Sequence, residues 1–511
     1  MGFFRTMLNN NQRKSRPLTK KSTLSPRPVY PTVEENIHYL KEALFHTDDL
    51  VRQAVSIPGY TAEFLFMYTM CEQRKIREEI LQPISDNKDG ELEQILISMR
   101  ANKHDDLEKV VDLVVKGNAV LFIDGIEECF VIEVKSDHAR NVAEPNNERV
   151  VEGSHEGFVE CISINLQLVR KHIENRNLVV KRYKLGNETK IETVIVYLQN
   201  LANPKLIDEV DRRIQNIDAD NISTSEFIEE YIEDKSFSPF PQLLHTERPD
   251  RVIGNLLEGR VALLAEGSPT ALIMPATFFA FYQSPDDYSF RSLQGSFIRF
   301  IRMFSFVIAI GLPAYYIAVV SYHFEVIPQE LLLPIKSSIE HIPFPPILEA
   351  LFMELTIELL REAGIRLPGP VGQTIGIVGG LVIGDAVVKA GLVSNAMIIV
   401  VALTAIASFV VPSHEMSASV RMLRFPVMVA ASLFGFIGIV FSLMIILIHL
   451  CRLESFGTPY FAPAAPFRLK DWKDAIIRLP QWMLKQRPKD PAPQKRNTQS
   501  HPVKEEQRND K

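Results

Sequence analysis

The pattern of apolar and polar positions changes midway along the chain. Between residues 34 and 245, short apolar runs bounded by turn residues alternate with segments whose apolar residues recur at helical spacing. Such mixed elements predict an α/β region of two subdomains, with a boundary near residues 145–160. Two antiparallel strand pairs are expected, VRQAVSI with AEFLFMY (51–68) and NAVLFIDGIEECFVIEV (118–134), the second turning at Asp124-Gly125.

The same alternation continues toward the middle of the chain. A helix is expected over about 158–175, followed by the strand-like runs VKRYKL and KIETVIVYL and a helix over 206–217. A connector over 246–300 contains GRVALLAEGSPTALIMPATFF (259–279), which is long enough to suggest a membrane span. Glu266 and the Gly-Ser-Pro sequence after it interrupt this run, and each half has the length of a strand. We therefore expect a hairpin there.

The back half carries the long apolar segments of a membrane domain, expected over residues 301–451. MFSFVIAIGLPAYYIAVVSY (303–322) holds no charged residue. At about 1.5 Å per residue, such a helix matches a hydrocarbon core of about 30 Å. Together these segments predict an all-α polytopic transmembrane domain of four spans. The other three spans are expected over 371–393, 395–412 and 425–449.

Overall composition hides this division. The 511 residues are 46% hydrophobic and 23% charged with a net charge of −6, as in an ordinary soluble protein. Residues 1–30 hold seven basic residues and no acidic one, and residues 466–511 hold twelve basic and six acidic residues. We expect a disordered basic tail over 1–33 that faces the membrane surface loosely, and a cytosolic basic tail over 452–511.

The two ends also set the expected topology. The N-terminal region lacks the apolar stretch of about 7–15 residues of a signal peptide, so we expect it to stay in the cytosol. Basic residues after the last span favour the same side for the C-terminus. Both ends inside require an even number of spans, and counting ILEALFMELTIELLREA (347–363) as a fifth would break this parity. The weak point is Arg421 and Arg424, which four spans would place on the outer side.

The segment 347–363 is instead expected to be an amphipathic acidic helix beside the membrane. On a helical wheel Glu354, Glu358 and Glu362 share one face, with Arg361 beside them. One interpretation is an interfacial helix with a solvated acidic face. The other is a lining that attracts cations at a pore mouth, as carboxylate rings do in cation channels. The three glutamates are therefore candidate ion-path residues.

Glycines recur every four residues in the expected span 371–393, at Gly372, Gly376, Gly380 and Gly384. The three overlapping GxxxG patterns leave one helix face without side chains, which permits close helix–helix packing. That packing can lie within one chain or between subunits. Asp385 and Lys389 have the i, i+4 spacing of a local ion pair.

Both tryptophans, Trp472 and Trp482, follow the last span within an apolar stripe among Lys and Arg residues. This pattern predicts an amphipathic segment on the cytosolic membrane surface, and docking on the soluble region is the alternative.

The sequence contains few patterns typical of a catalytic site. His155-Glu156 and His414-Glu415 lack the HExxH pattern of a zinc protease, and the four cysteines form no CxxC pair. The soluble region has neither a P-loop nor a dinucleotide-binding fingerprint. We expect no enzyme activity, no catalytic, cofactor-binding or metal-ligating residues, and no nucleic-acid partner.

Three stretches carry a resemblance to a known family, and the second and third are highly specific. They are RVVEGSHEGFVECISINLQLVRKHI (149–173), SPFPQLLHTERPDRVIGNLLEGRVALLAEGSPTALIMPATFFAFYQSPDDY (238–288) and PFPPILEALFMELTIELLREAGIRLPGPVGQTIGIVGGLVIGDAVVKAGLVS (343–394). With them, about residues 45–455 resemble the A subunit of bacterial spore germinant receptors, the GerA family.

This resemblance implies a multi-pass subunit of a complex in the spore inner membrane, with both termini cytosolic. Its partners would be a B subunit that resembles amino-acid transporters and binds the nutrient, and a lipoprotein C subunit. The A subunit of such receptors is thought to form a homo-oligomer, a pentamer, that acts as a nutrient-gated channel for monovalent cations. The alternatives are a non-conducting scaffold, a signal-transmitting subunit of the same complex, or a transporter component. Four spans without an internal repeat argue against the last.

Overall fold

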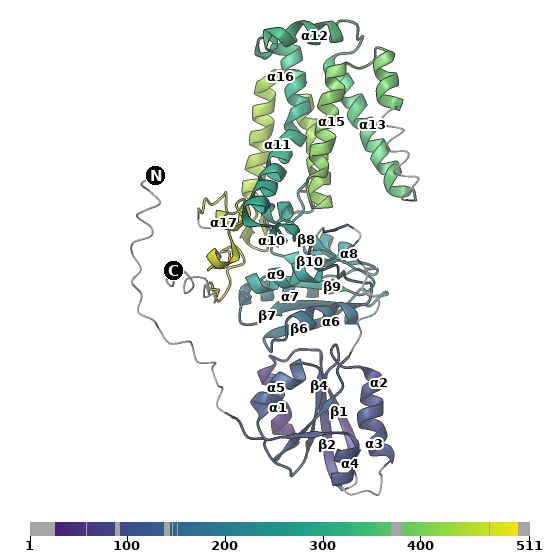
Figure 1. Cartoon of the computed structure of the whole chain (residues 1–511), viewed down its shortest axis with the longest axis vertical. Coiled ribbons are helices and arrows are strands. Elements are labelled where there is room, and N and C mark those ends of the chain that lie inside the picture. Colours follow the sequence, from purple (N-terminus) through teal and green to yellow (C-terminus); the bar gives the residue numbers. More distant parts are fainter. Residues whose placement is uncertain are drawn as a thin grey trace, which may run out of the picture. The chain divides into compact units, whose positions relative to one another are not determined.

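The computed structural model describes residues 26–57, 59–86, 92–136, 144–145, 147–150, 152–368, 380, 382–469 and 471–498. The chain forms two compact units, Met1–Asp137 with Glu174–Arg176, and His138–Ile173 with Asn177–Lys511. Each unit contains a five-stranded antiparallel sheet, and the second also contains the helices of the back half (Figure 1). The expected order, an α/β region followed by a helical region, is confirmed.

The first unit is built on a sheet with the strand order β1-β2-β4-β5-β3. Its strands are β1 Leu50–Ile57, β2 Tyr60–Met67, β3 Asn102–His104, β4 Asn118–Ile123 and β5 Cys129–Glu133. Its helices are α1 Val33–Ala43, α2 Gln73–Ile76, α3 Gln82–Asp86, α4 Leu92–Ser98 and α5 Leu107–Val115, with a π-helical turn over Arg77–Leu81. Both expected strand pairs form, β1 with β2 and β4 with β5.

Helices cover both faces of this sheet (Figure 1). Successive strand residues point to opposite faces, so each strand feeds two cores. In β2, Leu65 and Met67 pack with α1 and α5, whereas Phe64 and Phe66 pack with α2 and α4. A strand that is buried on both faces is apolar at nearly every position, which explains the run AEFLFM.

Part of the expected N-terminal tail packs on the first unit. Val29 is buried in the core beside α1, and Pro28 forms a β-bridge with Asp106. The backbone N–H of Arg27 donates to Asp106 Oδ1 at 3.0 Å. Residues 26–33 therefore differ from the disordered tail predicted for 1–33, because Val29 contributes apolar surface to the core; residues 1–25 lie outside the described part.

The second unit begins with a sheet of strand order β6-β7-β9-β10-β8. Its strands are β6 Leu178–Leu185, β7 Ile191–Leu198, β8 Leu244–Thr246, β9 Val261–Ala265 and β10 Ala271–Met274. Its helices are α6 Ile162–His172, α7 Pro204–Gln215, α8 Ser225–Ile232 and α9 Pro249–Glu258. The hairpin expected over 259–279 is confirmed as β9 and β10, and β9 pairs with β7. The expected connector thus belongs to this sheet.

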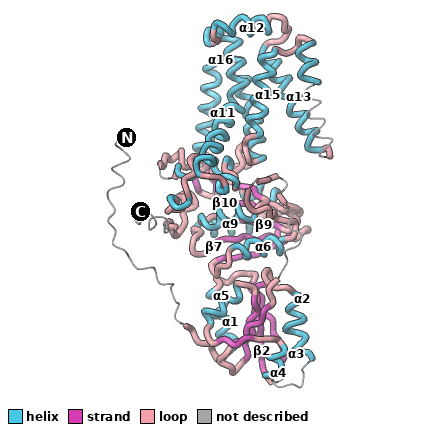
Figure 2. Tube along the Cα trace, viewed as in Figure 1, coloured by secondary structure: helices cyan, strands magenta, loops and turns pink. Residues whose placement is uncertain are grey.

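The short helix α10 (Asp286–Ser289) precedes the helices of the back half, which are drawn in cyan in Figure 2. They are α11 Ser292–Tyr322, α12 Gln329–Ile339, α13 Pro346–Arg366, α15 Asn395–Phe409 and α16 His414–Arg452, and residues 382–389 are also helical. Among the described residues, α11 and α16 are long and apolar enough to cross a membrane, and α15 is a shorter apolar helix. Three of the expected spans overlap these helices.

α16 reverses direction within its length. Gly435 has φ 59° and ψ −139°, a conformation that is essentially restricted to glycine. Glu415 before this break and His449 after it both contact residues at or near β8. The hydroxyl of Tyr322, at the far end of α11, donates to carbonyls just before Gly435. α16 is therefore a helical hairpin that leaves the sheet and returns to it, and the single span expected over 425–449 is interrupted.

α13 and α15 run in the same direction. The backbone N–H of Ser394 donates to Glu349 Oε2 at 2.8 Å near the start of both helices. Near their ends, Arg361 donates to Ser408 Oγ at 3.2 Å. The span expected over 371–393 falls between these two helices in the sequence, and its residues 382–389 are helical. Of that span, 371–379 and 381 lie outside the described residues.

After α16 the chain packs against the second sheet again. β11 (Glu454–Ser455) and β12 (Thr458–Pro459) form a short hairpin. The backbone N–H of Phe278, which follows β10, donates to the carbonyl of Tyr460 at 2.8 Å. The backbone N–H of Ala276 donates to Ser455 Oγ at 3.1 Å. The segments that enter and leave the helical part are thus bonded to each other.

Candidate functional site

The predicted ion-path residue Glu354 lies inside the helical bundle. Its carboxylate pairs with the guanidinium of Arg424 from α16, and the two side chains are 0% and 1% exposed. Arg424 Nε also donates to the carbonyl of Ala309 in α11 at 2.9 Å. A charge this deeply buried is tolerated only with a partner, so the pair ties α11, α13 and α16 together.

Glu358 lies one turn further along α13 and is 27% exposed. Its Oε1 accepts from Arg361 at 3.1 Å and lies 3.3 Å from Nε of Arg421 in α16. The guanidinium of Arg361 also lies over the ring of Phe409, 4.6 Å from its centroid. Glu358 is therefore neutralised by two cations but remains partly accessible.

Glu362 completes the predicted acidic face and is 60% exposed. It pairs with Arg366 at 2.6 Å, one turn along the same helix. The three glutamates thus pass from buried to exposed along α13. The helical wheel placed the three glutamates on one face. It did not show that Arg424 pairs with Glu354, or that Arg361 and Arg421 pair with Glu358. The sequence signal for the two α16 partners was that Arg421 and Arg424 are charges inside an apolar region.

The glycine stripe is described only at its second half. Gly372 and Gly376 lie outside the described residues. Apart from the backbone of the glycine's own helix, no atom of the described residues lies within 4 Å of the position that a Cβ would take at Gly380 or Gly384. These two glycines therefore pack against nothing in the described part of the chain.

The predicted ion pair in the same segment is confirmed. Lys389 Nζ lies 2.7 Å from Asp385 Oδ2, and the two side chains are 74% and 61% exposed. An exposed pair of this kind contributes little to stability, roughly 0–1 kcal/mol.

The segment around Trp472 docks on the second α/β sheet region. The indole ring lies 6.2 Å from the ring of Phe279 in the turn after β10. Next to it, Asp474 Oδ1 pairs with Arg299 of α11 at 3.0 Å. For Trp472 these contacts correspond to the docking alternative rather than to a place on the membrane surface. Trp482 is 53% exposed.

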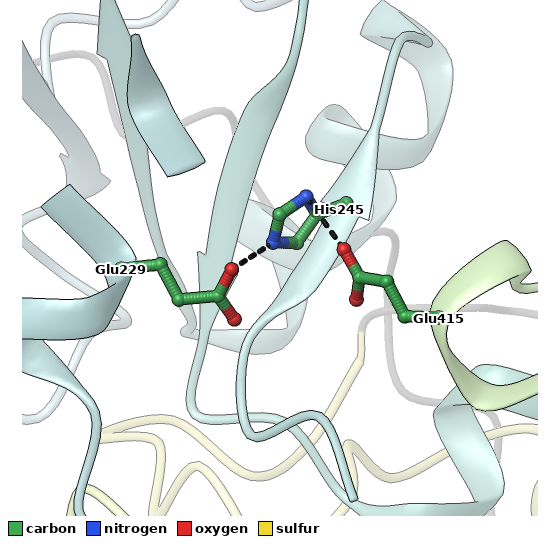
Figure 3. Close-up of side chains that lie close together, drawn as sticks. All are labelled: Glu229, His245 and Glu415. Atoms are coloured by element: carbon green, nitrogen blue, oxygen red, sulfur yellow. Dashed lines mark hydrogen bonds and ion pairs between the residues drawn. The ribbon is translucent and has the colours of Figure 1, made fainter. Parts of the chain in front are cut away.

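A further cluster joins the second sheet to α16 (Figure 3). His245 in β8 bonds Glu229 of α8 through Nε2 at 2.5 Å and lies 2.8 Å from Glu415 of α16 through Nδ1. The side chains are 16%, 15% and 32% exposed, respectively. An ionised carboxylate only accepts hydrogen bonds, so a ring bonded to two of them carries a hydrogen on each nitrogen. His245 is therefore an imidazolium held between two carboxylates.

The charge of this ring follows from its surroundings. Burial lowers the pKa of His245, but the hydrogen bonds that its ring donates to Glu229 and Glu415, together with the charges of the two carboxylates, outweigh burial and raise the pKa to about 10. Burial raises the pKa of Glu229. Sequence reasoning missed this cluster, because its members are far apart in the chain. In the sequence, Glu415 stood out only as part of His414-Glu415, which lacks the full HExxH pattern.

The same three residues are the only group in the described part of the chain whose ligand atoms cluster as a metal site would need, within 4.8 Å of one another. Their geometry is that of hydrogen bonds, however. The two ring nitrogens point to different carboxylates, whereas a metal ion would draw both carboxylates to one nitrogen. The arrangement fits a bound proton better than a bound metal.

Known proteins are similar to this chain over most of its length. The sequence model of the Bacillus/Clostridium GerA spore germination protein family matches residues 38–490. The membrane protein YfkQ of Bacillus subtilis is 40% identical over 470 residues, 90% of this chain and 92% of its own length. Spore germination protein A1 of the same organism is 40% identical over 462 residues, 90% and 95% of the two chains.

Among solved structures, the N-terminal domain of the A subunit of the Bacillus megaterium spore germinant receptor GerK3 matches with a TM-score of 0.40 and 28% identity. The match covers 50% of this chain and 99% of that chain. The family match extends from the first sheet to the segment that follows α17 (Trp472–Ala475). The chain therefore belongs to the Bacillus/Clostridium GerA spore germination protein family and is of the A-subunit type.

Proposed function

We propose that copies of this chain assemble into a nutrient-gated channel for monovalent cations within a germinant receptor. The observation that carries the proposal is the placement of ionisable side chains on α13, among helices apolar enough for a membrane. Ionisable residues in such segments usually face a water-filled path or a partner. Glu358 and Glu362, at 27% and 60% exposure, are the carboxylates accessible to an ion.

The helical part supports a multi-pass topology with six crossings. The hairpin at Gly435 converts the last expected span into two passes, and α13 adds another. With α11, α15 and the return between α13 and α15, the total is even. An even number keeps the sheets and the C-terminal segment on the same side, which we assign to the cytosol of the spore, beneath its inner membrane.

Two features of the bundle surface support a homo-oligomer, and we assign the five copies that the resemblance implies. Gly380 and Gly384 have no neighbour in the described part of the chain, and close helix contact is the usual role of such stripes. On α13, Leu348, Phe352 and Leu355 are 48%, 48% and 56% exposed. These surfaces are available to other copies, to lipid, or to the other receptor subunits.

The wider complex follows from the family. We assign as partners a B subunit that resembles amino-acid transporters and a lipoprotein C subunit. In this assignment the nutrient binds B, and the two α/β sheets transmit or stabilise the assembly. The role of this chain is conduction rather than catalysis.

Potassium release tests the ion path. Spores in which this receptor is the only one present are triggered with nutrient broth, and potassium in the medium is measured with an electrode. We expect Glu358→Gln with Glu362→Gln to slow the release several-fold, with receptor amount unchanged by immunoblot. Asp385→Asn removes an exposed carboxylate outside α13 and is the matched control. Unchanged release in the double variant would refute the assigned path.

Conduction itself is tested with the purified receptor in potassium-loaded liposomes. A nutrient-dependent potassium flux is expected. Its absence, in a preparation that still assembles, would favour the second candidate, a non-conducting subunit that transmits the signal. One observation favours that candidate: inside a single chain, Glu354 and Glu358 face three arginines, so the buried cluster is net positive.

A further inference from the structure

Both ends of the α16 hairpin are bonded to one short stretch of the second unit. At the returning end, Ser238 Oγ lies 2.8 Å from His449 Nε2, and Lys235 Nζ donates to the carbonyl of Arg452 at 3.2 Å. At the starting end, His245 holds Glu415. A single segment, residues 235–245, therefore contacts both ends of the hairpin.

The two attachments differ in kind. The returning end packs Leu450 and Leu453 into the core of the second sheet, and its polar contacts are hydrogen bonds. The starting end also buries Met416 in that core, but its polar contact is ionic. An ionic contact can be switched by a change of charge or of water access, whereas apolar packing cannot be switched in this way.

Glu415 lies where a helix favours negative charge. It lies in the first turn of α16, whose N-cap residue Ser413 accepts a hydrogen bond from the N–H of Met416 at 3.3 Å. Negative charge is favoured at this end of a helix. One carboxylate oxygen is satisfied by His245. The other, Oε2, is buried without a hydrogen-bond partner among the described residues. A carboxylate that is only half satisfied gains from rearrangement.

We propose that Glu229, His245 and Glu415 form an ionic latch that holds the first turn of α16 against β8 in the resting receptor, and that its release is a step in transmitting the nutrient signal. The proposal rests on the proposed function in one respect: it takes α16 to belong to the part of the receptor that changes when the nutrient binds. It does not require that this chain conducts ions.

Three other titratable groups lie within reach of the latch charges. Glu226 on α8 and Glu233 just after it interact with Glu229, and Tyr460, after β12, interacts with Glu415. None of the three is bonded to the ring. The three latch residues therefore set its charge, and they can be exchanged in pairs.

A charge exchange tests the latch. His245→Glu alone places three carboxylates together, and Glu415→Lys alone places two cations together, so each breaks the contact. The double variant restores opposite charges. The readout is the dilution of nutrient broth that gives a half-maximal germination rate, in spores that carry only this receptor. We expect each single variant to shift this dilution roughly tenfold toward weaker broth, and the double variant to return within about twofold of the original.

Controls separate this outcome from misfolding. His414→Gln and Glu230→Gln change neighbouring exposed side chains on the same two helices and should leave the response unchanged. Immunoblots of spore membranes report receptor amount. His245→Gln, which removes the charge without introducing repulsion, covers the case in which the reversal variants fail to accumulate, and should shift the dilution in the same direction.

Three results would overturn the latch. The first is a normal response from His245→Gln, and the second is a double variant no better than either single one. The third is one equivalent of zinc or another divalent metal in the purified full-length protein, lost in His245→Gln, since the ring would then ligate a metal. Failure of potassium flux in liposomes would count against conduction but leaves these outcomes unaffected.

Discussion

Glu354 and Arg424 are both shielded from water, so each makes the other's charge tolerable. Exchanging Glu354 for Gln leaves the guanidinium buried and uncompensated, and breaking a buried pair in this way costs about 3–5 kcal/mol. We expect Glu354→Gln to lower the thermal midpoint of the detergent-solubilised protein sharply. Glu354→Leu with Arg424→Met replaces the pair by apolar groups and should recover most of the loss.

Glu362→Gln is the matched control, because its partner Arg366 is 77% exposed and the pair should contribute less than about 1 kcal/mol. Fluorescence-detected size exclusion after heating measures both variants. Equal midpoints for Glu354→Gln and Glu362→Gln would contradict the assigned burial.

His245 gives a pH dependence of definite sign. Its pKa is about 10 in the folded chain against an ordinary value of 6.5, so the folded state binds the proton more tightly than the unfolded state. The resulting stabilisation is complete below about pH 6.5 and is lost as pH rises toward 10. We expect the thermal midpoint to fall between pH 7 and 10 by more in the original protein than in His245→Gln. Parallel pH profiles would be inconsistent with a charged ring.

Which side chains pair with each other was the feature hardest to predict from the sequence. The spacing of Glu354, Glu358 and Glu362 placed them on one helix face. The partners that α16 supplies, Arg424 for Glu354 and Arg421 for Glu358, are fixed only by the tertiary fold. The same holds for His245, whose two carboxylates lie on different helices. Asp385 and Lys389 could be paired from sequence because both lie on one helical turn.

At the scale of elements, Gly435 is the hinge of a helical hairpin. A Cβ at this position would lie 3.0 Å from Nε2 of His323 and 3.3 Å from Cδ2 of Tyr322. The backbone conformation itself costs a non-glycine residue about 1–3 kcal/mol. We expect Gly435→Ala to lower the thermal midpoint in detergent. Gly311→Ala in α11 is the control. Outside the backbone of α11 itself, no described residue lies within 4 Å of the added methyl group, and alanine favours a helix. Equal effects would refute the hairpin turn.

Elements with local signals were predicted well. The hairpin at Asp124-Gly125 and the β9–β10 hairpin form as expected, because turn residues and strand lengths are visible within a few positions. The reversal in α16 was missed. Apolar residues flank Gly435 on both sides, and the stretch 425–449 has the length of one span, so periodicity alone could not separate one helix from two.

At the scale of the whole molecule, the hairpin in α16 predicts that both ends of this helix lie on the same side of the membrane. In a background without other cysteines, Cys451 and a cysteine introduced by His414→Cys should react with a membrane-impermeant maleimide from the same side of the membrane. Leu433→Cys, next to the turn, should react from the opposite side. Cys161 alone, just before α6 in the second unit, reports the side on which the second sheet lies. Labelling of Cys451 and His414→Cys from opposite sides would favour one straight span over 425–449.

The backbone contacts between Phe278 and Tyr460 and between Ala276 and Ser455 have a further consequence. Because the strands before the helices and the segment after them are bonded together, the helical part is an insertion into a domain whose two flanking segments pack on each other. Domains of this kind tolerate exchange of the inserted segment. Replacing residues 304–447 by a short glycine-serine linker keeps Arg299 and Arg302 beside Asp287 and keeps Leu450 in the core. The product should be monodisperse without detergent and unfold cooperatively. The part of this chain that holds the two α/β sheets would then be obtainable as a soluble reagent.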